Sequence, residues 1–282
     1  MFTKQTIKDI DLKGKTVLLR ADYNVPFENG KITDDYRIKM SLPTVKYLHE
    51  HASKLIICSH LGRPKNAQDK EFSLAPVAKR LSQLLDKKVE FVDDCVGKKV
   101  SDAVKKLPEK GILLLENVRF YPEEEANDKV FAKKLASNAD VFVQDGFGVV
   151  HRAHASTEAI THFLPSVAGE LLEREVDTIT NAMQNPERPL MAIVGGAKIS
   201  DKIELLEKLI PLADVIALGG AMANPFLAAQ GHDVAKSLIE KSDIPLAKEI
   251  IKKAEAETKK RQFSFFIPHD VVAAKAIDKT AP

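Results

Sequence analysis

Short apolar runs alternate along the chain with segments of helical periodicity, and polar turns separate the two. The apolar runs predict buried strands at residues 15–20, 54–59, 89–92, 112–116, 141–143, 190–194, 214–218 and 263–267. Apolar residues at helical spacing predict helices at residues 42–52, 74–84, 100–107, 169–182, 203–210 and 244–258, and one that bears Phe131 and Leu135. Strands that alternate with helices are typical of parallel sheets in an open α/β fold.

Polar residues mark where several of these segments begin and end. Ser73 is a candidate N-cap for one helix, and Asn127 or Asp128 is a candidate for another. The helical pattern at residues 169–182 is followed by the proline-containing stretch 185–189, which is the best domain boundary in the chain. We therefore expect two α/β units joined by a helix.

Polar side chains follow the predicted strands at their carboxyl ends, where open α/β sheets bind their ligands. In chain order these side chains are Asp22 and Asn24, His60 and Arg63, Arg119, and Arg152 a few residues after a fourth strand. The carboxyl ends of parallel strands share one edge of a sheet, so we expect these residues to form one rim.

Arginine usage narrows the chemistry of this rim. The chain has only nine arginines against 33 lysines, and Arg37, Arg63, Arg119 and Arg152 lie in predicted loops at the rim. A planar guanidinium binds a phosphate or carboxylate through two parallel hydrogen bonds, so the cluster predicts an anion site. Any one of these arginines taken alone is better explained as a solvated loop residue. The four taken together are better explained as an anion site.

Histidines could add donors to the same rim. His60 follows one strand, and His151 and His154 flank Arg152. The spacing of His151 and His154 also occurs in metal sites, but no cysteine or carboxylate partner lies nearby in the sequence. We therefore predict no metal site.

The stretch 190–210 has a second kind of anion signature. A predicted strand is followed by Gly195 and Gly196 and then by a predicted helix, which is a geometry that aims backbone N–H groups at an anion. Lys198 and Lys202 are four residues apart, so we expect them to share a face of the first helical turn. Two ammonium groups there repel each other by roughly 0.2–0.5 kcal/mol, which a bound polyphosphate would offset. A βα turn with two solvated lysines explains the local pattern about equally well.

Composition excludes several classes of function. The 282 residues suggest about two domains, and a formal net charge of +2 gives no reason to expect nucleic acid or an anionic membrane as partner. No run of 18 apolar residues predicts a membrane span. The two cysteines form no metal or redox motif, and with no apolar signal core at the N-terminus they suggest a reducing cytoplasm.

Seven segments, taken in order, carry a resemblance that covers the whole chain. They are RADYNVP from Arg20, DYRIKMSLPT from Asp35, SHLGRP from Ser59, LLLENVRFYPEEE from Leu113, HRAHAS from His151, VGGAKISDKI from Val194 and GGAMANPFL from Gly219. With these segments the chain resembles phosphoglycerate kinase.

The resemblance implies two parallel-sheet, Rossmann-like α/β lobes joined by a hinge helix. An acceptor domain for 3-phosphoglycerate would span residues 1–168, the hinge helix residues 169–185, and a nucleotide-binding domain residues 186–282. Because the family continues with further strands and a glycine-rich phosphate loop, the resemblance implies that the second lobe is truncated here. Tyr23, Gly146, Ala221, Pro225 and His269 depart from the usual pattern, the last three on the adenosine side.

The implied reaction is reversible phosphoryl transfer between 1,3-bisphosphoglycerate with ADP and 3-phosphoglycerate with ATP, a glycolytic step that requires Mg²⁺ bound with the nucleotide. Arg37 and Lys198 are the implied catalytic residues. The implied substrate site comprises Asp22, Tyr23, Asn24, Arg37, His60, Leu61, Gly62, Arg63, Arg119 and Arg152. The implied nucleotide site comprises Gly196, Ala197, Lys198, Lys202, Gly219 and Gly220.

Two other classes of function compete with this hypothesis. A non-catalytic anion-binding module would keep the rim while its truncated second lobe does nothing. An oxidoreductase would need G-x-G-x-x-G after a strand and an acid about 20 residues further on, and neither GGAKIS nor GGAMAN fits. The resemblance further implies a cytoplasmic monomer with small-molecule partners, without nucleic acid or membrane.

Overall fold

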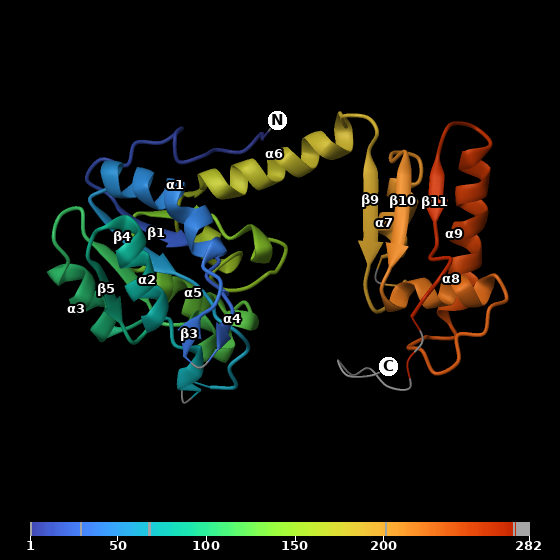
Figure 1. Ribbon diagram of the computed structural model, residues 1–282. Helices are drawn as coiled ribbons and strands as arrows, with labels where there is room; N and C mark the ends of the chain where they lie inside the picture. The colour runs from blue at the N-terminus through green and yellow to red at the C-terminus, as the bar shows by residue number, and fades with distance from the viewer. Residues whose placement is uncertain (1, 29, 67–68, 201, 273, 275–282) are drawn as a thin grey trace. The chain divides into compact units, whose positions relative to one another are not determined.

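The computed structural model describes residues 2–28, 30–66, 69–200, 202–272 and 274. The chain divides into two compact units, Met1–Ile179 and Thr180–Pro282 (Figure 1). The division falls within α6 (Glu170–Gln184), the helix expected at residues 169–182. A hinge function for this helix stays a prediction, as do the proposed domain limits.

The first unit is built on a parallel sheet, which has six strands within the described residues. In spatial order they are β5 (Val89–Val92), β6 (Ile112–Leu115), β4 (Lys54–Cys58), β1 (Thr16–Arg20), β7 (Val141–Gln144) and β8 (Ser166–Ala168). Five were expected. β8 was missed because Ser166, Val167 and Ala168 do not form a distinct apolar run. The small antiparallel pair β2 (Phe27–Glu28) and β3 (Lys31–Ile32) was missed because two-residue strands give no periodic signal.

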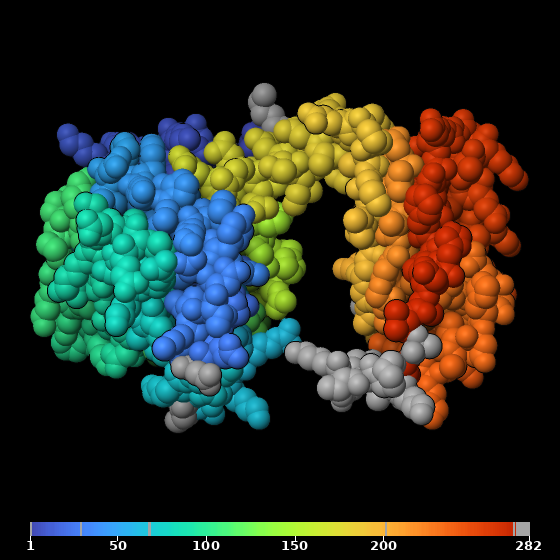
Figure 2. Space-filling view, viewed as in Figure 1, coloured from blue at the N-terminus to red at the C-terminus, as the bar shows by residue number. Residues whose placement is uncertain are grey.

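Both faces of this sheet are covered, which explains why its strands read as continuous apolar runs. On β1, Val17 and Leu19 pack into one core with Val45 of α1 (Tyr36–His51) and with α2 (Ala75–Leu85). Leu18 points to the other face and packs with residues of α3 (Lys98–Lys106) and α5 (Lys129–Ala136), among them Phe131. In the space-filling view, α1 and α2 cover the face turned toward the viewer (Figure 2).

Helix α1 begins at Tyr36, well before the predicted residue 42, so Arg37 lies in its first turn rather than in a loop. The expectation for Arg37 was therefore wrong. The first turn carries few apolar residues and gives no helical periodicity. Asp34 Oδ1 accepts the backbone N–H of Tyr36 (2.7 Å) at this start, and Pro43 lies inside the helix.

Two of the candidate helix caps differ in outcome. Asp128 caps α5, because its Oδ1 accepts the backbone N–H of Phe131 (2.7 Å). The cap position of α2 is Leu74 rather than Ser73. The Ser73 hydroxyl donates to Glu116 Oε2 (2.7 Å) and accepts the backbone N–H of Ala75 (3.3 Å), the first residue of the helix.

Short helical turns complete the first unit between these elements. They are η1 (Lys70–Phe72), η2 (Val118–Phe120), α4 (Pro122–Glu125), η3 (Phe147–Val149) and η4 (Ala159–His162).

The second unit contains a parallel sheet in the order β11 (Ser264–Phe266), β10 (Val215–Gly219) and β9 (Met191–Gly195). Helices α7 (Ile203–Leu209), α8 (Asn224–Ala229) and α9 (Asp243–Thr258) and the turn η5 (Ala221–Ala223) accompany it. The core joins Leu206, Ile216, Phe226 and Ile250. Both the strands and α9 match their expected positions.

The start of α7 corrects the expectation for the two lysines. The helix begins at Ile203, so Lys202 is its N-cap and Lys198 lies before it, and the two do not share a face of the first helical turn. Ile199, one residue after Lys198, is fully buried, and its carbonyl accepts the backbone N–H of Lys202 (2.8 Å).

Helix α6 begins on a buried carboxylate of the first unit. Asp145, directly after β7, accepts the backbone N–H groups of Leu171 (3.0 Å) and Leu172 (3.1 Å) at its Oδ1. A Cβ at Gly169 would lie 2.2 Å from that oxygen, so the approach requires glycine. Burial raises the pKa of Asp145 to about 6, because the ionised form loses its hydration.

We expect protonation of Asp145 to stabilise the folded chain below neutral pH. Its pKa is about 6 in the folded chain and near the ordinary 3.8 when unfolded, so the folded chain binds more protons between these values. Stability from this group is therefore lost as the pH rises from about 4 to about 6, by up to about 3 kcal/mol. Urea unfolding across this range should show the loss in the wild type and not in Asp145→Asn. The exposed Asp140→Asn is the control, and a constant difference between wild type and Asp145→Asn at all pH values would contradict the coupling.

Candidate functional site

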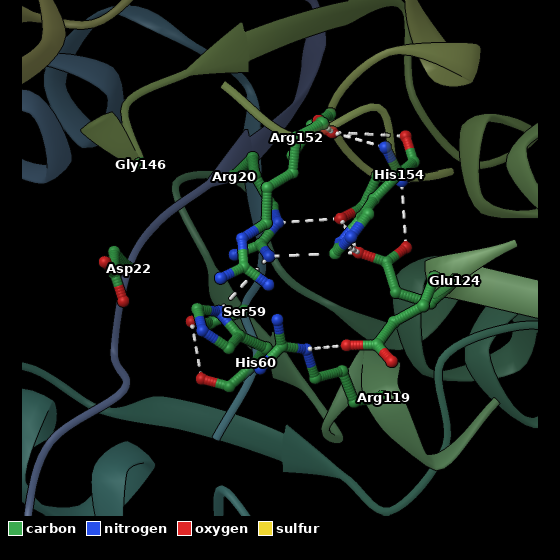
Figure 3. A network of polar contacts seen from close by, with 12 residues as sticks. Arg20, Asp22, Ser59, His60, Arg119, Glu124, Gly146, Arg152 and His154 are labelled. Carbon is green, nitrogen blue, oxygen red and sulfur yellow. Dashed lines mark hydrogen bonds and ion pairs between the residues drawn. The ribbon is translucent and has the colours of Figure 1, made fainter. Parts of the chain in front are cut away.

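The predicted rim residues of the first unit lie in four loops at the carboxyl edge of the sheet. Asp22 and Asn24 follow β1, His60 and Arg63 follow β4, Arg119 lies in η2 after β6, and Arg152 lies beyond β7. Strands β1, β4, β6 and β7 are consecutive neighbours in the sheet, so these loops converge (Figure 3).

Three of the predicted arginines line one cavity. Its volume is about 470 Å³, and Arg63, Arg119 and Arg152 reach it from three separate loops, with Glu125 among the other lining residues. Arg63 and Arg152 are exposed, while Arg119 is half-buried. The structure thus brings together side chains that lie up to 89 positions apart in the chain. Three converging guanidinium groups repel one another, and a bound anion would remove that repulsion.

Arg119 is held in place from two sides. Its NH1 donates to the Gly62 carbonyl (2.8 Å), and its Nε lies 3.1 Å from Glu125 Oε1. Burial lowers the pKa of Arg119, and the charge of Arg152 adds to this effect while Glu125 opposes it. The group remains charged at any physiological pH, since free arginine titrates far above neutrality.

Asp22 and Asn24 connect the first two loops. Asp22 pairs with Arg37 of α1 through its Oδ2, and its Oδ1 accepts the backbone N–H of Asn24 (3.1 Å). Asn24 Oδ1 in turn accepts the backbone N–H of Gly62 (2.8 Å). Arg37 itself is exposed, so its guanidinium is available to a ligand at the edge of the rim.

Tyr23 and Leu61, also expected in the substrate site, turn their side chains into the core. The Tyr23 hydroxyl contacts Ser41 Oγ (3.0 Å), and burial raises the pKa of Tyr23. Leu61 is clamped by Asn117, whose Oδ1 accepts the Leu61 N–H (3.2 Å) and whose Nδ2 donates to the Leu61 carbonyl (2.7 Å). At both positions only the backbone can contribute to a ligand site.

His60 lies almost fully buried beneath the rim. Burial lowers its pKa far below the ordinary value, and the charges of Arg20, Arg119 and Arg37 act in the same direction. His60 is therefore neutral at physiological pH. Its Nδ1 lies 3.3 Å from NH2 of Arg20.

Arg20, Glu124 and Ser156 were not expected in the site. Figure 3 shows Arg20 and Glu124 in the same polar network as His60 and Arg152. One signal was present, since Arg20 places a rare arginine at the end of an otherwise apolar strand. Glu124 and Ser156 gave no such signal, because glutamates in an acidic run and isolated serines usually lie on the protein surface.

In the second unit, two glycine pairs meet at the carboxyl ends of β9 and β10. Gly195 pairs with Gly219, and the Gly196 carbonyl accepts the backbone N–H of Met222 (2.9 Å). Gly220 has φ +65°, and a Cβ there would lie 3.2 Å from the Gly196 carbonyl oxygen. The structure thus brings Gly196, Gly219 and Gly220 together, as expected for a surface where a ligand approaches backbone.

The remaining residues of the expected nucleotide site are exposed. Ala197 follows the glycines, and Lys202 stands at the start of α7. Lys198 pairs with Glu240, with 2.5 Å between Nζ and Oε1. Both side chains are close to half exposed, so this pair contributes roughly 0–1 kcal/mol and an anion can displace Glu240 at little cost.

Within the described parts of the chain, no three or more His, Cys, Asp and Glu side chains are grouped so as to hold a metal ion. No described helix is long and apolar enough to cross a membrane.

Comparison with known proteins places this geometry in a family. The sequence profile of phosphoglycerate kinase matches residues 7–282. The chain belongs to the phosphoglycerate kinase family. The phosphoglycerate kinase of Moorella thermoacetica is 49% identical over 279 residues, which are 99% of this chain and 70% of that protein. The chloroplastic phosphoglycerate kinase 1 of Arabidopsis thaliana is 52% identical over 284 residues, which span 57% of its length.

A solved structure supports the fold. The phosphoglycerate kinase of Coxiella burnetii superposes with a TM-score of 0.79 at 39% identity, covering 99% of this chain and 70% of that one. The expected α/β class with parallel sheets is confirmed. As a member of the phosphoglycerate kinase family the chain is a phosphotransferase, and no comparison favours the non-catalytic anion-binding alternative.

Gly62 should be the residue of the rim that least tolerates a side chain. Its φ is +58°, and a Cβ would lie 2.3 Å from the Phe72 ring. We expect Gly62→Ala to lower the unfolding free energy by about 2–4 kcal/mol, from backbone strain of roughly 1–2 kcal/mol and the added clash.

Gly14→Ala is the matched control for this substitution. Gly14 has a similar φ of +73°, but a Cβ there would meet open space, so only the backbone strain applies. Urea unfolding of the two variants separates the terms. Equal losses would mean that Phe72 simply moves aside and that the ring does not hold this loop.

Proposed function

We propose that the chain catalyses reversible phosphoryl transfer between 1,3-bisphosphoglycerate with ADP and 3-phosphoglycerate with ATP. The observation that carries this proposal is the cavity lined by Arg63, Arg119 and Arg152 at the carboxyl edge of the first sheet. Three guanidinium groups suit a small, highly charged phosphate ester. Family membership supplies the class of reaction.

The 3-phosphate would bind to these three arginines together with His60. Asp22 and Asn24, which connect the loops after β1 and β4, would orient the rest of the acid. Arg37, exposed at the edge of the rim, would reach the carboxylate and the transferring group. Tyr23, Leu61 and Gly62 would contribute their backbone to the same site.

The nucleotide would bind to the second unit. The glycines at positions 196, 219 and 220 leave the backbone accessible to its phosphates, with Ala197 beside them. Lys198 would release Glu240 and stabilise the phosphoryl group in transit, and Lys202 would hold nucleotide phosphates. As in the family, Mg²⁺ would arrive as part of the nucleotide substrate.

For this reaction the protein has to align the two substrates and neutralise the charge of the transferring phosphoryl group. The attacking carboxylate is already ionised at neutral pH, since such groups titrate near pH 4, so no general base is required. The arginines and Lys198 would neutralise charge on the moving phosphoryl group. We further propose that the chain acts as a monomer in the cytoplasm.

A calorimetric titration of 3-phosphoglycerate into the chain tests the acceptor site. We expect saturable binding, and we expect Arg63→Ala to weaken it at least about tenfold, which corresponds to about 1.4 kcal/mol. Arg80→Ala is the control, because Arg80 pairs with Asp35 and Gln83 outside the cavity. No binding to a demonstrably folded chain would refute the acceptor assignment.

The helix α6 is the segment within which the two units divide, and acid and nucleotide would bind to different units. We therefore expect Thr178→Gly with Asn181→Gly to lower turnover severalfold while leaving the affinity for each substrate nearly unchanged. Each glycine weakens a helix by about 1 kcal/mol relative to alanine. The matched control replaces the same two exposed residues by alanine. An equal loss of binding would contradict a hinge function.

A further inference from the structure

Arg20 and Glu124 form a buried polar pair that the proposed reaction does not use directly. Arg20 is 1% exposed and Glu124 is fully buried. The Ser156 hydroxyl connects them, since it accepts from Arg20 Nε (2.7 Å) and donates to Glu124 Oε1 (2.5 Å). The Ser156 N–H donates to the second oxygen of Glu124 (2.9 Å). This arrangement leaves neither charge unsolvated in the interior.

The guanidinium of Arg20 is fixed in orientation by these contacts. Its Nε is used by Ser156, its NH1 donates to the Ala21 carbonyl (2.5 Å), and its NH2 lies 3.9 Å from Glu124. The NH2 group also lies 3.3 Å from Nδ1 of His60, within hydrogen-bonding distance. Figure 3 shows this contact as part of the network beneath the rim.

This contact determines which nitrogen of His60 carries the proton. A guanidinium has only donors, so it can bind Nδ1 only if Nδ1 presents a lone pair. A neutral imidazole with an acceptor at Nδ1 carries its proton on Nε2. Arg119, Arg37 and His154 also act on His60, and each of them disfavours a second proton on its ring.

We propose that Arg20, held by Glu124 and Ser156, is a positioning residue that fixes His60 as the neutral tautomer with its proton on Nε2. His60 then offers one hydrogen-bond donor to a phosphate anion without adding a positive charge to the arginine cluster. In the opposite tautomer Nε2 would carry a lone pair and could not donate a hydrogen bond. The binding consequence rests on the proposed function, whereas the tautomer itself does not.

Long-range ¹H–¹⁵N spectra of the full chain labelled with ¹⁵N-histidine test the proposal, with His60→Gln used to assign the signals. In the wild type we expect His60 to show a protonated Nε2 and an unprotonated Nδ1, unchanged from about pH 8 to about pH 5.5, a window that spans the ordinary titration of histidine. A protonated Nδ1, or titration within this range, would overturn the proposal whatever the variants do.

The variant Arg20→Met with Glu124→Gln removes both charges together and so leaves no unpaired buried ion. We expect its His60 signals to show a mixture of tautomers or a titration, with the affinity for 3-phosphoglycerate reduced about tenfold. Arg188→Met with Asp214→Asn is the matched control, since it neutralises an arginine–carboxylate pair in the second unit. An unchanged Nε2-protonated His60 in the folded variant would refute the positioning role of Arg20.

The two proposals fail in different ways. If the wild type shows the expected tautomer but does not bind 3-phosphoglycerate, the proposed function is wrong and the positioning of His60 stands. If 3-phosphoglycerate binds but His60 is protonated at Nδ1, the acceptor site stands and the role of Arg20 is wrong. If the double variant does not fold, the wild-type spectra still decide the tautomer. Ser156→Ala then removes the hydroxyl that holds Arg20 without removing a charge.

Discussion

Parallel pairing of β1 on both of its sides is the constraint on which the first unit depends. Arg20, the last residue of β1, lies in register with Cys58 of β4 and Gln144 of β7. The ladder continues just beyond, where the Ala21 N–H donates to the Cys58 carbonyl and the Asp145 N–H donates to the Arg20 carbonyl, both at 3.0 Å. Three of the four rim loops therefore leave the sheet on one line, and the fourth, which carries Arg119, follows β6, the neighbour of β4.

Buried polar side chains that never reach the cavity hold those loops in place. Glu116 accepts the N–H groups of Leu74 and Asn117 (both 2.8 Å), and Asn117 clamps Leu61. Glu124 performs a similar role under the loop that carries Arg152. Because each of these groups has several hydrogen-bond partners, burial is tolerated and the network fixes a single geometry. The positive charge of the rim thus rests on a layer that contains both signs of charge.

The two units differ in how they would bind anions. The first uses side chains, chiefly arginines on separate loops, whose planar groups match a phosphate. The second uses backbone, because Gly196 and Gly220 allow two loops to touch without intervening Cβ atoms. Lys198 there pairs with Glu240, and because both side chains are close to half exposed, water screens this contact. This difference supports the proposed site for a small acid in the first unit and the proposed site for polyphosphate in the second.

The sequence by itself determined the α/β class, the strands of both parallel sheets apart from β8, and the grouping of rim residues at strand ends. It could do so because fully buried parallel strands are apolar on both faces and because ligand groups follow their carboxyl ends. Local pattern failed at three places: Arg37 lies in a helix, Leu74 rather than Ser73 takes the N-cap position of α2, and Lys198 and Lys202 do not share a helical turn. Only the tertiary structure decided which charges are buried. Arg20 is satisfied by Ser156, 136 residues away in the chain, and Asp145 by backbone N–H groups at the start of α6. Neither partner is in place until the chain has folded.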